Sequence, residues 1–521
     1  MKKILMTLGA CGLLMTGCVD LTQEPLSFPT PENINKTPEN IESILNGLYT
    51  TLWNQNYGYN CRSQLLNLGS DDVMSATETK RGTQFDALYF TTGNMDDDTE
   101  IMWTNMYQLI QAANQWIEGI EAADNLTEEE KLRYVAECRF MRAFGHFTLV
   151  RYFGNVPGFT NSLCTTDAWG NSAITRNNIE DIYNDIIIPD LQNAWTYLPD
   201  RDDENNRVSG KNSRVNKWAA KACLIDVYRT MAGWPLKQTD KWQLARDEAY
   251  EFVTTSPYTL VEHYEDLWKE ATKDDGTEHI FALNHSISQG GAGQYGKSYW
   301  IEEEGGWADY CADPVFYENY PDDERKDFNF KTTFTVAGSP RPLNYKQTIM
   351  KAPAIAKFRD YDANFDGNGV PSAQSNGITP IYRFAEVLLM YAEAQNELSG
   401  PDELAYECLN RVRYRAAKDK ENFVETSGLT KDQFRQAVFD EYGWELFSEF
   451  KRWFQLQRTE KIYDVNHGYT DVNGVQHPAN SRVAAELDRL GITSTDRSIY
   501  WYPLPSREVS DCGFEQNQKP Y

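Results

Sequence analysis

Hydrophobic side chains recur at helical spacing along most of the chain. The pattern is clearest between residues 132 and 158, where large apolar residues follow one another at intervals of four, four and three. These residues are Ala136, Phe140, Phe144 and Phe147. Further apolar positions widen this face, so we expect a helix that is buried nearly all round and needs other helices as partners.

Capping residues mark the two ends of this predicted helix. Thr127 and Glu130 have the spacing of a capping box, in which each side chain accepts a hydrogen bond from a backbone N–H of the other residue. Gly154 and Pro157 follow the last periodic position, and neither continues a helix readily. The helix is therefore predicted to begin after Thr127 and to end near Gly154.

The same periodicity predicts further helices before and after this one. The first of them starts at Pro38. The others span about 99–123, 178–198, 214–231, 240–255, 380–400, 401–417 and 430–458. Helix pairs of about 34 residues with small residues at their crossing points are typical of tetratricopeptide-like arrays. We therefore expect a mainly α fold, an array of tetratricopeptide-like helix pairs.

The middle of the chain has a different composition. Residues 257–378 are rich in glycine, tyrosine and tryptophan, with short strand-like runs near 280–283 and 331–336. We expect a loop-rich, mixed α/β region that packs on the helical array. The predicted organisation is thus an N-terminal helical region at 38–256, this loop-rich region, and a C-terminal helical region at 379–521 that completes a single body.

The N-terminus has the features of a bacterial export signal. Lys2 and Lys3 precede an apolar run that is too short to span a bilayer. The segment 14–18, Leu-Met-Thr-Gly-Cys, resembles a lipoprotein lipobox, which implies cleavage before Cys18 and acylation of that residue. We therefore interpret residues 1–17 as a signal peptide and 18–37 as a lipid tether, with ordinary secretion as the alternative.

The charge and the aromatic content of the chain favour some classes of ligand over others. The formal net charge is −27, and no basic stripe of the kind that nucleic acid requires is apparent. Aromatic residues make up 13% of the chain, and such a surplus in a polar protein suggests that some of them lie on a binding surface. An uncharged ligand such as a sugar fits this balance better than a polyanion does.

The cysteines do not form a recognisable framework. Seven follow Cys18, an odd number with irregular spacing, and Cys138, Cys223 and Cys408 lie in apolar helical patterns. We interpret them as small buried hydrophobic residues and not as disulfide partners or metal ligands.

Several helical segments together resemble the SusD/RagB family of outer-membrane nutrient-binding lipoproteins, nearly from end to end. The segments that carry this resemblance are AECRFMRAFGHFTLVRYFGNVP, RVNKWAAKACLIDVYRTMAGW, PIYRFAEVLLMYAEAQNEL, LNRVRYRAA, FDEYGWELFSEFKRWFQLQR and YWYPLPSREVSDCGFEQNQKPY. The chain departs from the family pattern at Pro520, where glycine is usual, and at Tyr442 and Gly443, which replace an acidic–basic pair.

The resemblance implies a function. A member of this family is a non-catalytic, surface-exposed lipoprotein of the outer membrane that binds a glycan and passes it to a SusC-like TonB-dependent transporter. No cofactor is expected. The helical side should contact the transporter, and an aromatic side should meet the ligand.

Most charged residues within the family-like helices are expected to serve the fold. Carboxylates and guanidinium groups set in apolar helices are buried on packing, and they need partners there. We therefore predict ion pairs between helices among Arg139, Arg142, Arg151, Arg383, Glu386, Glu393, Glu397, Arg411, Arg413, Glu445, Glu449 and Arg452.

Two aromatic-rich regions are candidates for the ligand site, because by resemblance sugar rings pack on aromatic side chains while polar groups take their hydroxyls. One is the early segment 57–94, with Asp72, Arg81, Tyr89 and Asn94. The other is the middle insertion, with Tyr295, Tyr299, Trp300, Trp307 and Tyr310 among flexible glycines. For any single residue, packing or a solvated loop is an alternative role, but as a group we favour the insertion.

Three other interpretations were weighed. Asp362, Asn364 and Asp366 imitate the first half of a calcium loop, but Ala373 stands where the bidentate acid is required, so a polar turn is favoured over a metal site. A glycan-degrading enzyme would need two acids across a cleft, and no pair stands out. A peptide-binding scaffold also remains open, since helical-repeat arrays often have that role.

Overall fold

The computed structural model describes residues 37–52, 67, 69–74, 92–162, 174–202, 214–274, 276–287, 297–336, 340–359 and 375–517, with only the backbone described at 92–98 and 481–482. The α-helices of the N-terminal half are α1 (Pro38–Leu48), α4 (Thr92–Glu121), α5 (Glu128–Phe153), α6 (Ile179–Ile182), α7 (Ile188–Tyr197), α8 (Lys217–Ala232) and α9 (Lys241–Thr255). Those of the C-terminal half are α10 (Pro314–Asn319), α11 (Glu324–Asn329), α12 (Phe384–Ser399), α13 (Glu403–Ala416), α14 (Lys431–Glu445), α15 (Arg452–Arg458), α16 (Ile462–His467), α17 (Ser481–Arg489) and α18 (Ser506–Cys512).

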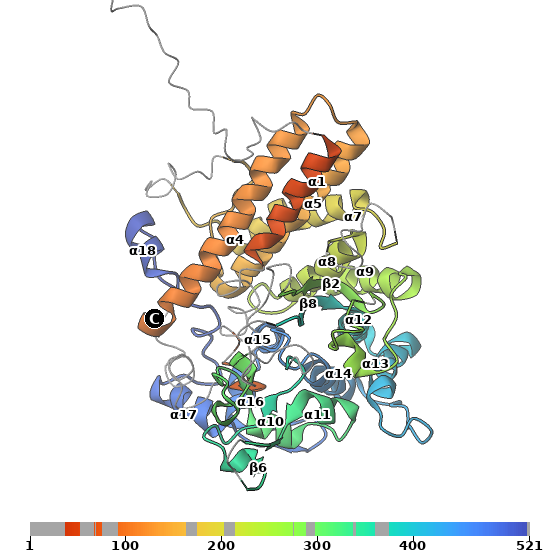
Figure 1. Cartoon of the computed structure of the whole chain (residues 1–521), viewed down its shortest axis with the longest axis vertical. Coiled ribbons are helices and arrows are strands. Elements are labelled where there is room, and N and C mark those ends of the chain that lie inside the picture. Colours follow the sequence, from red (N-terminus) through yellow and green to blue (C-terminus); the bar gives the residue numbers. More distant parts are fainter. Residues whose placement is uncertain are drawn as a thin grey trace, which may run out of the picture.

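The long helices pack side by side as an array, as expected. Helix α4 lies along α5, α5 contacts α7, α7 contacts α8, and α8 contacts α9. Helix α9 then packs on α12, which contacts both α13 and α14 (Figure 1). The mainly α, tetratricopeptide-like fold predicted from the sequence is confirmed.

Local capping explains where these helices begin and end. Thr127 and Glu130 form the predicted capping box at the start of α5, and Gly154 ends the helix with a φ of 73°. Thr37 caps α1, which has Pro38 in its first turn, and Thr430 forms a capping box with Gln433 at the start of α14. Each cap satisfies backbone N–H groups that have no partner within the helix.

Short antiparallel strand pairs connect distant segments. The pairs are β1 (Val73–Met74) with β3 (Cys311–Ala312), β2 (His279–Asn284) with β8 (Ile378–Arg383), β4 (Phe330–Lys331) with β7 (Ala354–Ile355), β5 (Thr333–Phe334) with β6 (Leu343–Asn344), and β9 (Tyr469–Thr470) with β10 (Gln476–His477). The β2–β8 pair runs from His279 opposite Arg383 to Asn284 opposite Ile378, with irregularities in the register on either side of Phe281. It joins the loop-rich middle region to the C-terminal helices.

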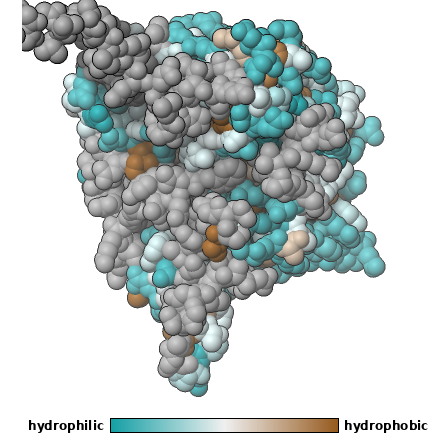
Figure 2. Space-filling model, turned by 45° about the horizontal axis from the view of Figure 1, so that its top comes forward, coloured by the Kyte–Doolittle hydropathy of each residue, from teal (hydrophilic) through white to brown (hydrophobic). Residues whose placement is uncertain are grey.

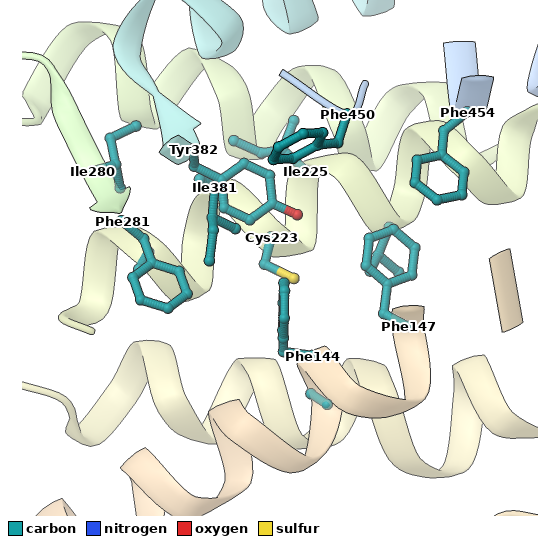
Figure 3. Packing of buried hydrophobic residues seen from close by; sticks show 14 of the residues in the cluster. Phe144, Phe147, Cys223, Ile225, Ile280, Phe281, Ile381, Tyr382, Phe450 and Phe454 are labelled. Carbon is teal, nitrogen blue, oxygen red and sulfur yellow. The ribbon is translucent and has the colours of Figure 1, made fainter. Parts of the chain in front are cut away.

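The main core lies where these strands meet α5 and α8. Phe144 on α5 faces Phe281 on β2 edge-on, with ring centroids 6.3 Å apart. Figure 3 shows Phe144 directed toward Cys223 of α8 and Tyr382 of β8. All four side chains are at most 1% exposed, so their burial is a principal source of stability.

The charged residues of these helices form a buried ionic network, as predicted. Arg142 donates to both carboxylate oxygens of Asp190, and Arg458 does the same to Glu393. Further buried or half-buried pairs are Arg151–Asp226, Arg383–Glu278, Arg383–Glu449, Lys451–Glu386, Arg413–Glu441 and Arg452–Asp71. Arg411 is an exception, because it pairs with Glu407 on its own helix.

Two of the departures from the family pattern, Tyr442 and Gly443, fit this network, while Pro520 lies outside the described residues. The Tyr442 hydroxyl donates to Glu386 at 2.7 Å and accepts from Arg229 at 2.9 Å, so it links an acid to a base. A Cβ atom on Gly443 would lie 2.7 Å from a guanidinium nitrogen of Arg452, so the glycine leaves room for that side chain.

Two helix predictions for the C-terminal half are wrong. Residues 380–383 belong to strand β8, not to the start of α12, because they pair with β2 about a hundred residues earlier in the chain. The helix predicted over 430–458 is broken after Glu445, where Ser448 and Phe450 adopt left-handed φ values of 59° and 65°. The Ser448 N–H donates to Asp72 at 3.1 Å, a contact that a continuous helix would not provide.

Two further expectations concern the cysteines and the membrane. Cys138, Cys223 and Cys408 are buried thiols outside any disulfide, as predicted. None of the described helices combines the length and the apolar character required to cross a bilayer. The predicted signal peptide, the anchor Cys18 and the tether lie outside the described residues, and the predicted division into three regions stays a prediction.

Candidate ligand-binding face

The structure brings the two candidate regions together. Val73 of β1 lies opposite Ala312 of β3, and Met74 lies opposite Cys311. The Asp313 N–H also donates to the carbonyl oxygen of Asp72 at 2.9 Å. The early segment and the middle insertion, which are separate in sequence, therefore share one small sheet. We call residues 71–74 and 297–312 the candidate face.

Trp307 is the aromatic side chain that this face exposes. Its side chain is 41% exposed, more than that of any other tryptophan in the described ranges. The backbone N–H of Trp307 donates to the Lys297 carbonyl oxygen at 2.7 Å, and the Lys297 ammonium lies 5.9 Å from the centre of the indole ring. The loop thus presents a wide indole surface with a cation beside it.

The other described aromatics of the insertion are buried. Tyr299 and Tyr310 are 1% and 4% exposed, and their rings pack together at 5.3 Å. Trp300 is 5% exposed beneath the Arg359 guanidinium, which lies 3.9 Å from its ring centre. These three side chains anchor the loop by packing beneath it, and they expose little surface to a ligand.

Glycine shapes the turn that carries Trp307. A Cβ atom on Gly306 would lie 2.0 Å from the Trp300 carbonyl oxygen, so no other residue fits this close approach. The preceding Gly305 has a φ of 83°, and Ala308 is also left-handed at 52°. The turn is therefore fixed by its backbone, and the sequence requires glycine there for steric reasons.

Asp72 has a structural role beneath the face. Its side chain is 0% exposed and accepts hydrogen bonds from the Ser70 hydroxyl and the Ser448 N–H. Burial, with a smaller contribution from neighbouring Asp71, raises the pKa of Asp72 to about 6. Asp71 itself accepts two hydrogen bonds from Arg452, at 2.6 and 2.7 Å.

The remaining predicted residues are less informative. Asn94 lies in the first turns of α4 and not in a loop as expected, and only its backbone is described. Tyr295, Arg81, Tyr89 and the calcium-loop candidates Asp362, Asn364 and Asp366 lie outside the described residues. Their roles stay predictions.

Sequence reasoning also missed two aromatic residues. Trp234 and Trp242 line a cavity of about 590 Å³ beside α14. The available signal was a Gly-Trp-Pro turn in the connection between two predicted helices, followed by a second tryptophan at the start of the next helix. That signal is weak, because tryptophans in such connections commonly serve packing alone.

The described surface shown in Figure 2 is mostly polar. Hydrophilic residues cover most of the coloured part of that view, with small, separate hydrophobic spots. The large hydrophobic residues that are exposed, including Trp307, Tyr250 and Tyr414, are scattered over different elements. Single exposed rings among polar groups suit small polar ligands better than they suit a broad hydrophobic interface.

Comparison with known families gives two matches. The model of the SusD family matches residues 331–518, and a family model described as "starch-binding associating with outer membrane" matches residues 24–228. A SusD-like protein P2 of Formosa agariphila is 27% identical over 479 residues, which cover 88% of this chain and 91% of that protein.

Solved structures show the same fold. A SusD homolog of Bacteroides thetaiotaomicron aligns with a TM-score of 0.76 at 24% identity, over 94% of this chain and 98% of that one. A surface glycan-binding protein A from the same organism, solved in complex with laminarihexaose, aligns with a TM-score of 0.69 at 18% identity, over 92% and 99%. At these identities the likeness concerns the fold.

Proposed function

Because the chain belongs to the SusD/RagB family, we propose that it binds a glycan at the bacterial outer membrane without cleaving it and delivers the glycan to a SusC-like TonB-dependent transporter. The observation that carries this proposal is the exposed indole of Trp307, held at the junction of the two candidate regions. An exposed ring of this kind packs against the C–H face of a sugar, while polar neighbours bind its hydroxyls.

Structural neighbours support the class of ligand. The neighbour solved with laminarihexaose shares the fold over nearly its whole length, and a further neighbour is described as a laminarin-binding SusD-like protein. The oligosaccharide that this chain takes is a separate question, since loop residues decide the shape of a pocket. The SusC-like partner and the lipid anchor at Cys18 are inferred from the family.

The placement of the acids supports a non-catalytic role. The carboxylates of the ionic network, such as Glu445 and Glu449, are buried against arginines inside the helical array. A glycosidase needs two carboxylates on either side of a bound sugar, one of them protonated. The buried acids described above have structural partners instead.

Titration calorimetry tests the binding claim. The mature chain is titrated with hexasaccharides of β-1,3-glucan, α-1,4-glucan, xylan and mannan. Trp307→Ala should weaken the strongest of these interactions roughly tenfold or more, as expected for an aromatic anchor. Tyr250→Ala, which removes an exposed ring on α9, is the control and should change nothing. Unchanged affinity in the Trp307 variant would contradict the proposed site.

The delivery claim needs a separate experiment. A tagged copy of the full chain should co-purify a TonB-dependent transporter from detergent-solubilised outer membranes. Replacement of Cys18 by alanine should release the chain from the membrane fraction. Recovery of the tagged chain without a transporter would contradict delivery and leave glycan binding intact.

A further inference from the structure

A cavity of about 590 Å³ is lined by no residue of the candidate face. Its walls come from the end of α8 and the start of α9, from one side of α14, and from α15 and β9 (Figure 1). We call it the α14 groove. Its volume falls within the range of about 300–1,000 Å³ that is usual for small-molecule sites.

Aromatic rings line the groove on several sides. Trp242 comes from α9, Phe439 from α14 and Tyr469 from β9, and Trp234 lies in the connection between α8 and α9. All four are partly exposed. Trp234 is fixed by edge-on packing on Tyr500, with ring centroids 4.9 Å apart. These rings add apolar surface to the wall. One face of Tyr469 stacks on His477, with ring centroids 4.4 Å apart, and the Arg452 guanidinium lies 4.7 Å from the centre of the Phe439 ring.

The charges of the groove are paired with groups of the protein. Five acids and four bases line it. Arg458 donates to both oxygens of Glu393 at 2.6 and 2.7 Å, and Lys237 pairs with Glu460 at 2.7 Å. Asp471 accepts from the N–H groups of Asn473 and Val475, each at 2.8 Å.

The other charges that line the groove have partners as well. Arg435 pairs with both Glu397 and Asp432, and Lys461 pairs with Asp464 at 3.0 Å. A charged ligand would therefore compete with an existing ion pair for its charged group. A neutral ligand would not, which favours polar molecules without charge.

The backbone around the groove is held in an unusual conformation. Lys237 and Glu460, the pair that closes one end, both have left-handed φ values, 52° and 59°. The Trp234 N–H donates to the Arg458 carbonyl oxygen at 2.9 Å, so the two connections are joined through their backbones. Residues in such conformations cluster at ligand sites, because the surrounding structure must hold them there.

From the aromatic walls, the paired charges and the size of the cavity, we infer that the α14 groove is a second saccharide-binding site, which takes a neutral oligosaccharide segment independently of the candidate face. The inference rests on the proposed glycan-binding function, since the ligand class is the same. Thr239, Gln436 and Thr470 add polar groups to the wall. The Gln436 amide already donates to Asp440 at 2.8 Å, and the Thr470 hydroxyl donates to Gln476 at 2.8 Å, so a sugar hydroxyl would bind beside these contacts or replace them. Two separate sites would let the chain hold one long glycan at two points.

Calorimetric stoichiometry tests this inference. With the best hexasaccharide of the panel, the mature chain should bind one ligand at the face and one in the groove. Trp242→Ala should abolish binding in the groove and leave binding at the candidate face. Trp307→Ala should abolish binding at the face and leave binding in the groove. Tyr250→Ala lies on the same helix as Trp242 but outside the groove, so it should retain both events.

A second variant distinguishes loss of the groove from misfolding of the Trp242 variant. Thr239 is exposed at the groove, so Thr239→Trp should fill the groove from its rim without removing any core contact. It should abolish the same binding as Trp242→Ala. If only one ligand binds and only Trp307→Ala abolishes its binding, the inference is overturned and the proposed function stands. If only one ligand binds and only the groove variants abolish its binding, the proposed face is overturned instead. The absence of binding by every hexasaccharide would contradict both.

Discussion

Arg383 and Glu449 form a buried bidentate pair: Nε of Arg383 donates to one carboxylate oxygen at 2.8 Å, and Nη2 donates to the other at 2.9 Å. Both side chains are 1% exposed. Arg383 ends strand β8, while Glu449 lies in the break between α14 and α15. The pair therefore fixes the position of that break against the sheet.

Replacing Arg383 by methionine should strongly destabilise the fold. The change removes the one cation that pairs with all three of Glu278, Glu445 and Glu449, although Arg415 and Lys357 remain beside them. Removing one partner of a buried pair costs about 3–5 kcal/mol. Urea denaturation measures the free energy of unfolding. Lys346→Met is the control, because the Lys346–Glu318 pair is exposed, and it should leave that free energy unchanged. Equal stability of the two variants would contradict a structural role for the network.

Two glycines should respond to alanine with opposite signs. Gly443→Ala places a Cβ atom 2.7 Å from the Arg452 guanidinium and should destabilise by about 1–3 kcal/mol. Gly47 lies within α1 with nothing within 4 Å of an added Cβ, so Gly47→Ala should stabilise by about 0.5–1 kcal/mol. Thermal unfolding of both variants measures these two changes in stability. A gain of stability in the Gly443 variant would contradict the close packing of Gly443 against Arg452.

The stability of the protein should depend on the protonation of Asp313. Burial, followed by smaller repulsion from Asp71 and Asp72, raises the pKa of Asp313 from 3.8 to about 7. Between about pH 4 and pH 7 the folded state therefore holds a proton that the unfolded chain has lost. The stabilising contribution of this proton is fully present below pH 4 and disappears as pH rises through 7.

Asp313→Asn provides the measurement. The variant cannot titrate at this position, yet asparagine can still cap α10, where Asp313 accepts from the Val315 N–H at 2.8 Å. The free energy of unfolding of the wild type, minus that of the variant, should fall by roughly 2–4 kcal/mol between pH 4 and pH 7.5. A constant difference across this range would show that Asp313 is ionised throughout.

The buried thiols should resist modification. Burial raises the pKa values of Cys138, Cys223 and Cys408, so little thiolate is present at neutral pH. Maleimide labelling of the native protein followed by peptide mapping should leave these three residues unmodified, whereas labelling in urea should modify all of them. Rapid native labelling of any one would contradict its position in the core.

Periodicity and capping predicted most of the helical array, because α5 and its neighbours bury continuous apolar faces that leave a clear spacing in the sequence. Ion pairing was predictable for the same reason, since a charge within an apolar helix needs a partner. The strand at 380–383 was not predictable in this way, because its partner β2 lies far away in the sequence. The break at Ser448 depends on a contact with Asp72, which local pattern does not reveal.

The sequence selects the insertion as a candidate region, and it does not reveal which of the aromatic rings there is exposed. The insertion contains several aromatic side chains within a few residues of one another, and composition treats them alike. The fold buries Tyr299, Trp300 and Tyr310 and leaves Trp307 exposed. Which ring faces outward depends on the turn at Gly305 and Gly306 and on packing against Arg359, and neither can be read from spacing.

The most direct test of glycan capture without catalysis is to measure binding and cleavage in one sample. The mature chain is equilibrated with the hexasaccharide that binds best in calorimetry, and the mixture is then separated by chromatography. We expect saturable binding that Trp307→Ala weakens, with the hexasaccharide recovered intact after prolonged incubation. Shorter products that increase with protein concentration, or the absence of binding by every glycan tested, would contradict the account.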